Sequence, residues 1–125
     1  MRRFKIFTLA ALTAGSLASF TSANEFAPAM ESYLKDHVMG WANDPVIVDA
    51  ILEQNTRHGG LSQGEIDAMD QAWRAEVGGS DTPTIDPVLS NTAAAFLRSQ
   101  VEGSGGVITE VFVMDFHGLN VAASD

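Results

Sequence analysis

The chain contains no cysteine among its 125 residues, which rules out disulfides, a thiol nucleophile and thiolate metal sites. Basic residues are also scarce, because 7 Lys and Arg stand against 16 Asp and Glu. Three of those basic residues, Arg2, Arg3 and Lys5, lie at the N-terminus, so residues 24–125 carry a net charge of −12. Such a surface repels phosphate groups, and we expect neither nucleic acids nor anionic membranes as partners.

Only the N-terminus has a long hydrophobic run, and the first 23 residues have the pattern of a secretory signal peptide. The basic residues precede the apolar stretch Ile6–Phe20 and a small-residue cleavage site at 21–23. An uncleaved anchor is the competing interpretation, but the stretch is shorter than the about 20 apolar residues that span a bilayer. We therefore expect cleavage before Asn24, a periplasmic mature chain of 24–125, and no membrane insertion after cleavage.

A helical period dominates the mature chain up to the last glycine-rich linker. Asp44 before a proline predicts an N-cap, and Ser62 with Glu65 has the spacing of a capping box. Glycine pairs mark the expected helix ends. The predicted helices are 28–42, 45–58, 63–77 and 87–101.

The last twenty residues predict a β-hairpin with strands 107–115 and 119–124. The turn sequence includes Gly118, which is suited to a left-handed backbone conformation. Apolar residues point to both faces of the first strand, so we expect both faces to be covered. The predicted fold class is α+β, with four N-terminal helices followed by this hairpin.

The three histidines, His37, His58 and His117, are isolated in the sequence and form no metal-binding helix motif. We interpret His58 as a last-turn residue that interacts with the helix dipole, and His117 as the tip of a turn. The sequence therefore predicts no metal site.

Two groups of residues contain fragments of catalytic chemistry. Glu65, Asp67 and Asp70 lie close together on one predicted helix, but this spacing fits a solvated helix start better than an acid–base pair. Asp115–His117 and Ser124–Asp125 hold parts of a nucleophile constellation without a nucleophile elbow. We predict no catalytic residue and no cofactor.

Trp41 and Trp73 are large enough to form the wall of a ligand pocket. Each stands at helical spacing from apolar neighbours, and this pattern favours a place in the core. A pocket wall is the alternative.

Four segments follow the secretory signal in a distinctive order: Trp41–Pro45, Asp70–Arg74, Phe112–Asp115 and Gly118–Val121. Together they resemble the N-terminal portion of small periplasmic Cache-type sensor proteins, whose domains are PAS-like. The resemblance covers essentially the whole of 24–125.

The resemblance implies an antiparallel sheet with a long N-terminal helix on one face and a pocket for small metabolites on the other. The ligand-binding positions that it favours are Trp73, Arg74, Phe112, Met114, Ser124 and Asp125. Cache domains continue with further strands after the position of Asp125. We therefore expect a truncated domain in which Leu119–Asp125 is an unpaired, aggregation-prone edge.

Two functions follow from this interpretation. The first is a non-enzymatic periplasmic domain of Cache type that senses or binds a small molecule. The alternative is a small secreted helical interaction protein that completes its sheet by pairing the open edge with a partner or with a second copy.

Overall fold

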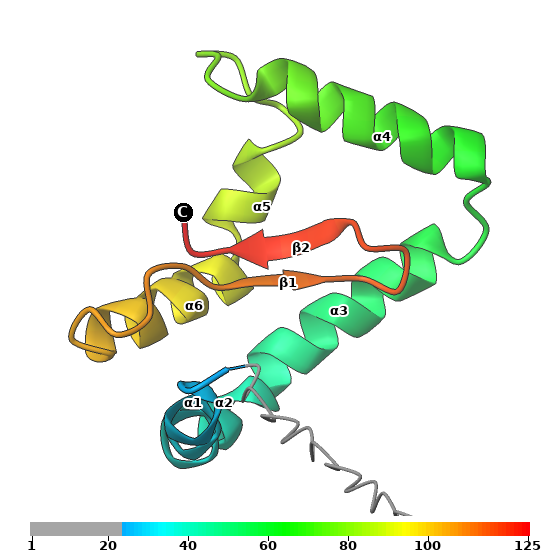
Figure 1. The fold of residues 1–125 in the computed structure, drawn as a ribbon. Helices are drawn as coiled ribbons and strands as arrows, with labels where there is room; N and C mark the ends of the chain where they lie inside the picture. The colour runs from blue at the N-terminus through cyan, green and yellow to red at the C-terminus, as the bar shows by residue number, and fades with distance from the viewer. Residues whose placement is uncertain (1–23) are drawn as a thin grey trace, which may run out of the picture.

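A computed structural model of the chain describes residues 24–125, in which helices pack against a two-stranded antiparallel sheet (Figure 1). Within these residues the five helical segments are the continuous run α1 (Ala27–Tyr33), η1 (Leu34–Val38) and α2 (Met39–Ala42), then α3 (Pro45–His58), α4 (Gln63–Glu76), α5 (Asp86–Ser90) and α6 (Thr92–Gly103). The strands are β1 (Phe112–Met114) and β2 (Asn120–Ala123). The prediction of a mixed helix and hairpin fold is confirmed, with five helical segments instead of four. The expected signal peptide, 1–23, lies outside the described residues.

Two helices begin where capping chemistry predicts. The Asp44 carboxylate accepts a hydrogen bond from the Val46 N–H at 2.9 Å and caps α3. The Ser62 N–H donates to the Glu65 carboxylate at 2.8 Å, and the Ser62 hydroxyl accepts from the Glu65 N–H, so a capping box opens α4. These bonds from Ser62 hold the pKa of Glu65 below its usual range. Both predicted caps are confirmed.

The predicted helix 28–42 is present as one run, but a π-helical turn interrupts it at η1. A π turn contains more residues than an α turn and changes which side chains share a face. Here Met30, Leu34, Val38 and Trp41 all line one groove. The π turn therefore lies within a run that keeps a continuous apolar side.

The prediction of one helix over 87–101 is wrong, because Asn91 divides it into α5 and α6. Asn91 has an extended backbone with ψ of 170°. Its side chain accepts from the Ala94 N–H at 2.8 Å and donates to the carbonyl oxygens of Pro87 and Val121, each at 2.9 Å. The side chain thus ends α5, caps α6 and binds β2 at once.

The hairpin is shorter than predicted. Val113 pairs with Ala122, and the register shifts between Val113 and Met114. The turn has Gly118 at φ +82°, the predicted left-handed conformation. Residues 107–110 of the predicted first strand are not part of the sheet.

β2 is not the open edge that was expected over Leu119–Asp125. Residues Val121 to Ser124 are buried, and β2 contacts α3, α5 and α6 as well as β1. Asn91 donates to the Val121 carbonyl of β2, and Arg98 donates at 3.2 Å to the carbonyl of Ser124, the residue after β2. Side chains from the α5–α6 segment therefore satisfy two carbonyl groups of a segment that the sequence alone leaves unpaired.

The exposed face of the sheet is the face of β1 that carries Phe112 and Met114. Val111, which precedes β1, and Val113 pack against the core, as the alternating pattern of a strand requires. Phe112 and Met114 point the other way and are 51% and 46% exposed. Of the two faces expected to be covered, the described residues cover one.

The core lies between α3, α6 and the sheet. Its buried members are Ile47, Ala93, Ala94, Leu97 and Ala122. Leu97 is its largest fully buried side chain. Trp41 packs against this cluster and meets Phe96 edge to face, with ring centroids 6.5 Å apart, so its predicted place in the core is confirmed.

Replacing Asn91 with Ala removes the cap of α6 and the donor to Val121 together. We expect the free energy of unfolding to fall by about 2 kcal/mol, from a lost cap and an unsatisfied carbonyl. Urea denaturation followed by circular dichroism measures the change. The control Asn43→Ala removes an exposed amide at the end of α2 and should change stability by less than about 0.5 kcal/mol. Equal effects of the two substitutions would contradict this role of Asn91.

Candidate functional site

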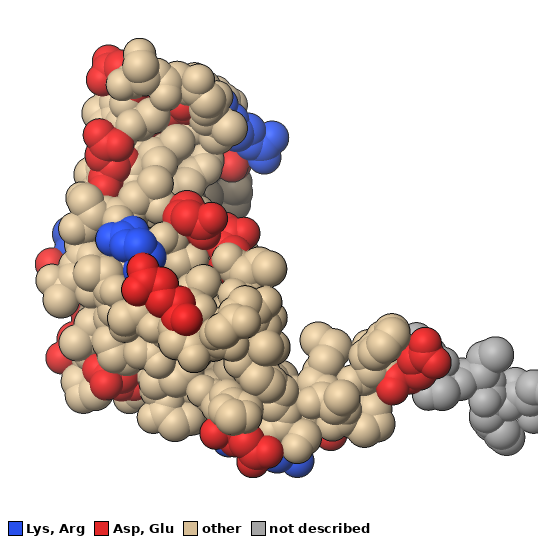
Figure 2. All heavy atoms as spheres, turned by 90° about the vertical axis from the view of Figure 1, so that its left-hand side faces the viewer, with Lys and Arg blue, Asp and Glu red and all other residues tan. Residues whose placement is uncertain are grey.

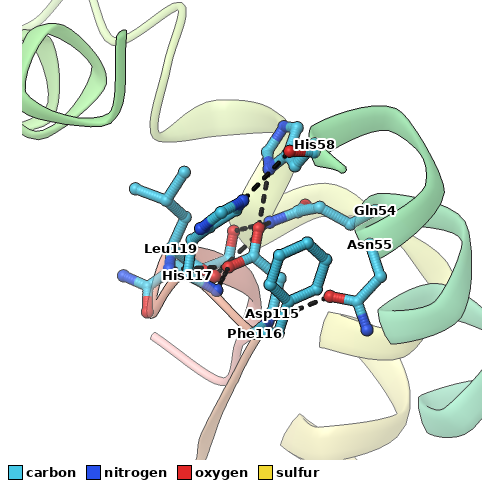
Figure 3. A network of polar contacts seen from close by, with 8 residues as sticks. Gln54, Asn55, His58, Asp115, Phe116, His117 and Leu119 are labelled. Atoms are coloured by element: carbon cyan, nitrogen blue, oxygen red, sulfur yellow. Dashed lines mark hydrogen bonds and ion pairs between the residues drawn. The ribbon is translucent and has the colours of Figure 1, made fainter. Parts of the chain in front are cut away.

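A buried carboxylate, that of Asp115, joins the hairpin turn to the C-terminal end of α3 (Figure 3). Its side chain has no exposed surface. From α3 it receives the Gln54 amide at 3.0 Å and the His58 Nδ1 at 2.6 Å. From its own turn it accepts the N–H groups of His117 at 2.9 Å and Leu119 at 3.0 Å. Four donors therefore surround a carboxylate that water does not reach.

The pKa of Asp115 is set by two opposing effects. Burial alone raises the pKa, because it disfavours the charged form. The hydrogen bonds from Gln54, His58, Leu119 and His117 favour the carboxylate and outweigh burial, so the pKa lies below its usual range. The Asp115 side chain is therefore an anion at neutral pH.

His58 is held by this anion through one ring nitrogen. Its Nδ1 faces Asp115, and its carbonyl oxygen lies 3.0 Å from the His117 Nε2. The His58 Nε2 has no hydrogen-bond partner among residues 24–125. Among these residues, every side-chain nitrogen or oxygen that is buried has a hydrogen-bond partner. Since the His58 Nε2 has none, it is not a buried atom. Asp115 thus fixes the ring and leaves one nitrogen free.

His58 forms part of the wall of a cavity of about 320 Å³ between α3, α4 and the hairpin. Gln54 and His58 come from α3, while Trp73 comes from α4. The hairpin contributes Leu119 and Asn120. The volume is at the lower end of the range for pockets that bind small organic molecules.

Two of the six predicted binding residues lie at or beside this cavity. Trp73 lines it, is half-buried and is not part of the core cluster, so the expected core position is wrong for this residue, and its role as the wall of a ligand pocket stays a prediction. Arg74 is exposed and pairs with Asp70 at 2.8 Å, and Asp70 itself lines the cavity. Arg74 therefore contacts a residue of the wall.

The other four predicted binding residues lie elsewhere. Phe112 and Met114 are on the exposed face of β1. Ser124 is buried, and its hydroxyl accepts from the Val111 N–H at 3.1 Å and donates to Asp125, which is exposed. The structure does not bring these four residues to Trp73.

The carboxylates of α4 have local partners, as the interpretation of a helix start requires. Glu65 belongs to the capping box, and Asp67 accepts from Gln63 at 2.7 Å. Asp70 pairs with Arg74. Among residues 24–125 no group of three or more His, Asp or Glu side chains is placed to hold a metal ion.

Sequence reasoning missed the main site. It treated His58 as a dipole residue and grouped Asp115 with His117, whereas the Asp115 carboxylate binds the His58 ring. One signal was available, because Gln54 and His58 are four residues apart at the end of α3 and share a helix face. Two polar side chains on the face that continues from Ile47 and Ile51 indicate a buried polar partner.

Comparison with protein-family models, with curated proteins and with solved structures found no match. The resemblance to Cache domains therefore stays a prediction from the residues. Within the described part of the chain, no helix has the length and apolar character needed to cross a bilayer.

Replacing Asp115 with Asn keeps the size of the side chain and removes the charge that the four donors surround. We expect stability at neutral pH to fall by about 2–3 kcal/mol. Because the folded pKa of Asp115 is lowered, its stabilisation is complete above the ordinary Asp pKa and is lost as pH falls through the folded pKa. Acidification should therefore destabilise the wild type more than Asp115→Asn.

Thermal unfolding across an acid pH series measures this difference. The control Asp49→Asn changes an exposed carboxylate of α3 and should leave both stability and its pH dependence unaltered. Parallel acid curves for the wild type and Asp115→Asn would show that Asp115 is not the buried anion described above.

Proposed function

We propose that this chain is an extracytoplasmic small-molecule-binding domain, of the ligand-sensing kind that its resemblance to Cache domains implies. Its ligand binds in the cavity beside His58. The observation that carries the proposal is that His58, whose Nε2 has no hydrogen-bond partner among residues 24–125, lines the same cavity as Trp73. A fixed polar atom beside a flat apolar surface is the usual composition of a ligand pocket.

The chemistry of the wall limits the ligand. The His58 Nδ1 faces the Asp115 anion, so the other ring nitrogen, Nε2, is the atom that can hydrogen-bond with a polar group of a ligand. Trp73 offers a face for a planar or apolar body. The ligand is therefore a compact organic molecule with one polar group next to an apolar part.

A binding role accounts for the site better than catalysis does. An imidazole–carboxylate pair acts as a base when a nucleophile lies against its free nitrogen. Among residues 24–125, no side chain donates to the His58 Nε2. The N-terminal secretory pattern of the sequence supports a place outside the cytoplasm.

Replacing His58 with Ala should weaken ligand binding. Because it also removes one of the four donors to Asp115, circular dichroism must establish that the variant folds. Isothermal titration of the chain with a panel of small metabolites that carry a polar group next to an apolar part measures affinity. For any metabolite that binds the wild type, we expect His58→Ala to weaken binding at least about tenfold, through the lost hydrogen bond and ring contact. Trp73→Ala should weaken it to a similar extent.

His37→Ala is the matched control, because His37 is exposed on η1 and lies outside the cavity. It should bind as the wild type does. Absence of saturable binding across the panel, or equal affinity in His58→Ala and His37→Ala, would overturn the proposal.

A further inference from the structure

A second hollow, larger than the ligand cavity, lies on the opposite side of the fold from α4. It is a groove of about 640 Å³ between the N-terminal run α1–η1–α2 and the extended segment Val107–Val111. Figure 1 shows that the N-terminal run lies on the side of β1 away from β2. Trp41 and Val111 line the groove and also pack against the core.

The walls of this groove are apolar and open. Phe26, Met30 and Leu34 on the N-terminal run are 65%, 58% and 48% exposed, and Val107 opposite them is 64% exposed. Single exposed apolar side chains are common, but several that converge on one groove mark an interaction surface.

The backbone along the groove is also unpaired. Among residues 24–125, the N–H and C=O groups of Thr109 and Glu110 have no hydrogen-bond partner. Ser124 donates to the Val111 carbonyl, so the next residue, Phe112, directs its own N–H and C=O away from β2. The edge of this segment thus offers main-chain groups to an added strand, in contrast to the capped edge of β2.

We propose that the groove binds an extended apolar segment of a basic partner protein, which adds as a strand beside Val107–Phe112. Alternate side chains of the segment enter the groove and contact the N-terminal run. Its main chain pairs with the free groups of Glu110 and Phe112. This proposal goes beyond ligand binding in the His58 cavity and does not depend on it.

Charge determines which partner fits. Residues 24–42 and 107–111 carry Glu25, Glu31, Asp36 and Glu110 against one basic residue, Lys35. Figure 2 shows acidic side chains spread over one face of the molecule with few basic ones. A second copy brings the same excess of acidic residues, −12 over residues 24–125, and is repelled, whereas Lys or Arg residues that flank an apolar strand are attracted.

A labelled peptide of alternating Val and Thr with two Lys at each end tests the proposal. Fluorescence polarisation with the full-length chain should show saturable binding that weakens as salt is added. Leu34→Asp places a charge in the apolar groove and should weaken binding by about tenfold or more. Leu52→Asp alters a comparably exposed leucine on α3, outside the groove, and should bind like the wild type.

Three results would overturn the proposal. The first is no binding of the Lys-flanked peptide by the wild type. The second is equal binding of a peptide with Glu in place of every Lys. The third is a dimer, seen in sedimentation velocity, that Leu34→Asp dissociates and Leu52→Asp does not, because the occupant is then a second copy. Circular dichroism of both variants establishes that they fold.

Discussion

The buried Asp115 carboxylate is the interaction on which the rest of the structure depends. It is the point where the hairpin turn and the end of α3, 57 residues earlier, are joined by His58 Nδ1 at 2.6 Å. The same carboxylate accepts two N–H groups of its own turn, so it shapes the turn and docks it with one side chain. Docking places β2 against α5 and α6 and places Leu119 and Asn120 in the cavity wall. Removing the charge leaves four donors facing a group that no longer accepts all of them.

The two strands differ in the hydrogen bonding of their outer edges, because different elements surround them. β2 carries Ala122 and Ala123, whose short side chains let α5 and α6 lie close enough for Asn91 to reach the carbonyl of Val121 and for Arg98 to reach that of Ser124, the residue after β2. β1 has larger side chains on its outer face, and no side chain among the described residues reaches the backbone of Thr109 and Glu110. Tertiary contacts therefore cover β2, while the backbone of the segment before β1 remains free to pair with an added strand.

How much of this was predictable from the sequence depends on the range of the interaction. Caps form between residues two or three apart, so Asp44 and the Ser62 box were predictable, as was the left-handed Gly118. Asn91 ends a helix partly because it binds Val121, which lies 30 residues later and is invisible to a local pattern. The pairing of His58 with Asp115 spans 57 residues, so the sequence offered a local signal only on α3, where Gln54 and His58 share one helix face. Phe112 and Met114 were correctly placed on one face, but the sequence does not reveal that the described residues leave this face uncovered.

The small core gives binding a direct effect on stability. Three of its five buried members are alanines, and Leu97 is the largest fully buried side chain, so little apolar area holds α3, α6 and the sheet together. A molecule that binds only the folded chain adds to the free energy of unfolding, by about 2.7 kcal/mol at a hundredfold excess over its Kd. For a domain of this size, such a contribution is a large fraction of the total. The cavity beside His58 and the groove beside Val107–Val111 border different ends of the hairpin, and an occupant of either site stabilises a fold whose own core is modest.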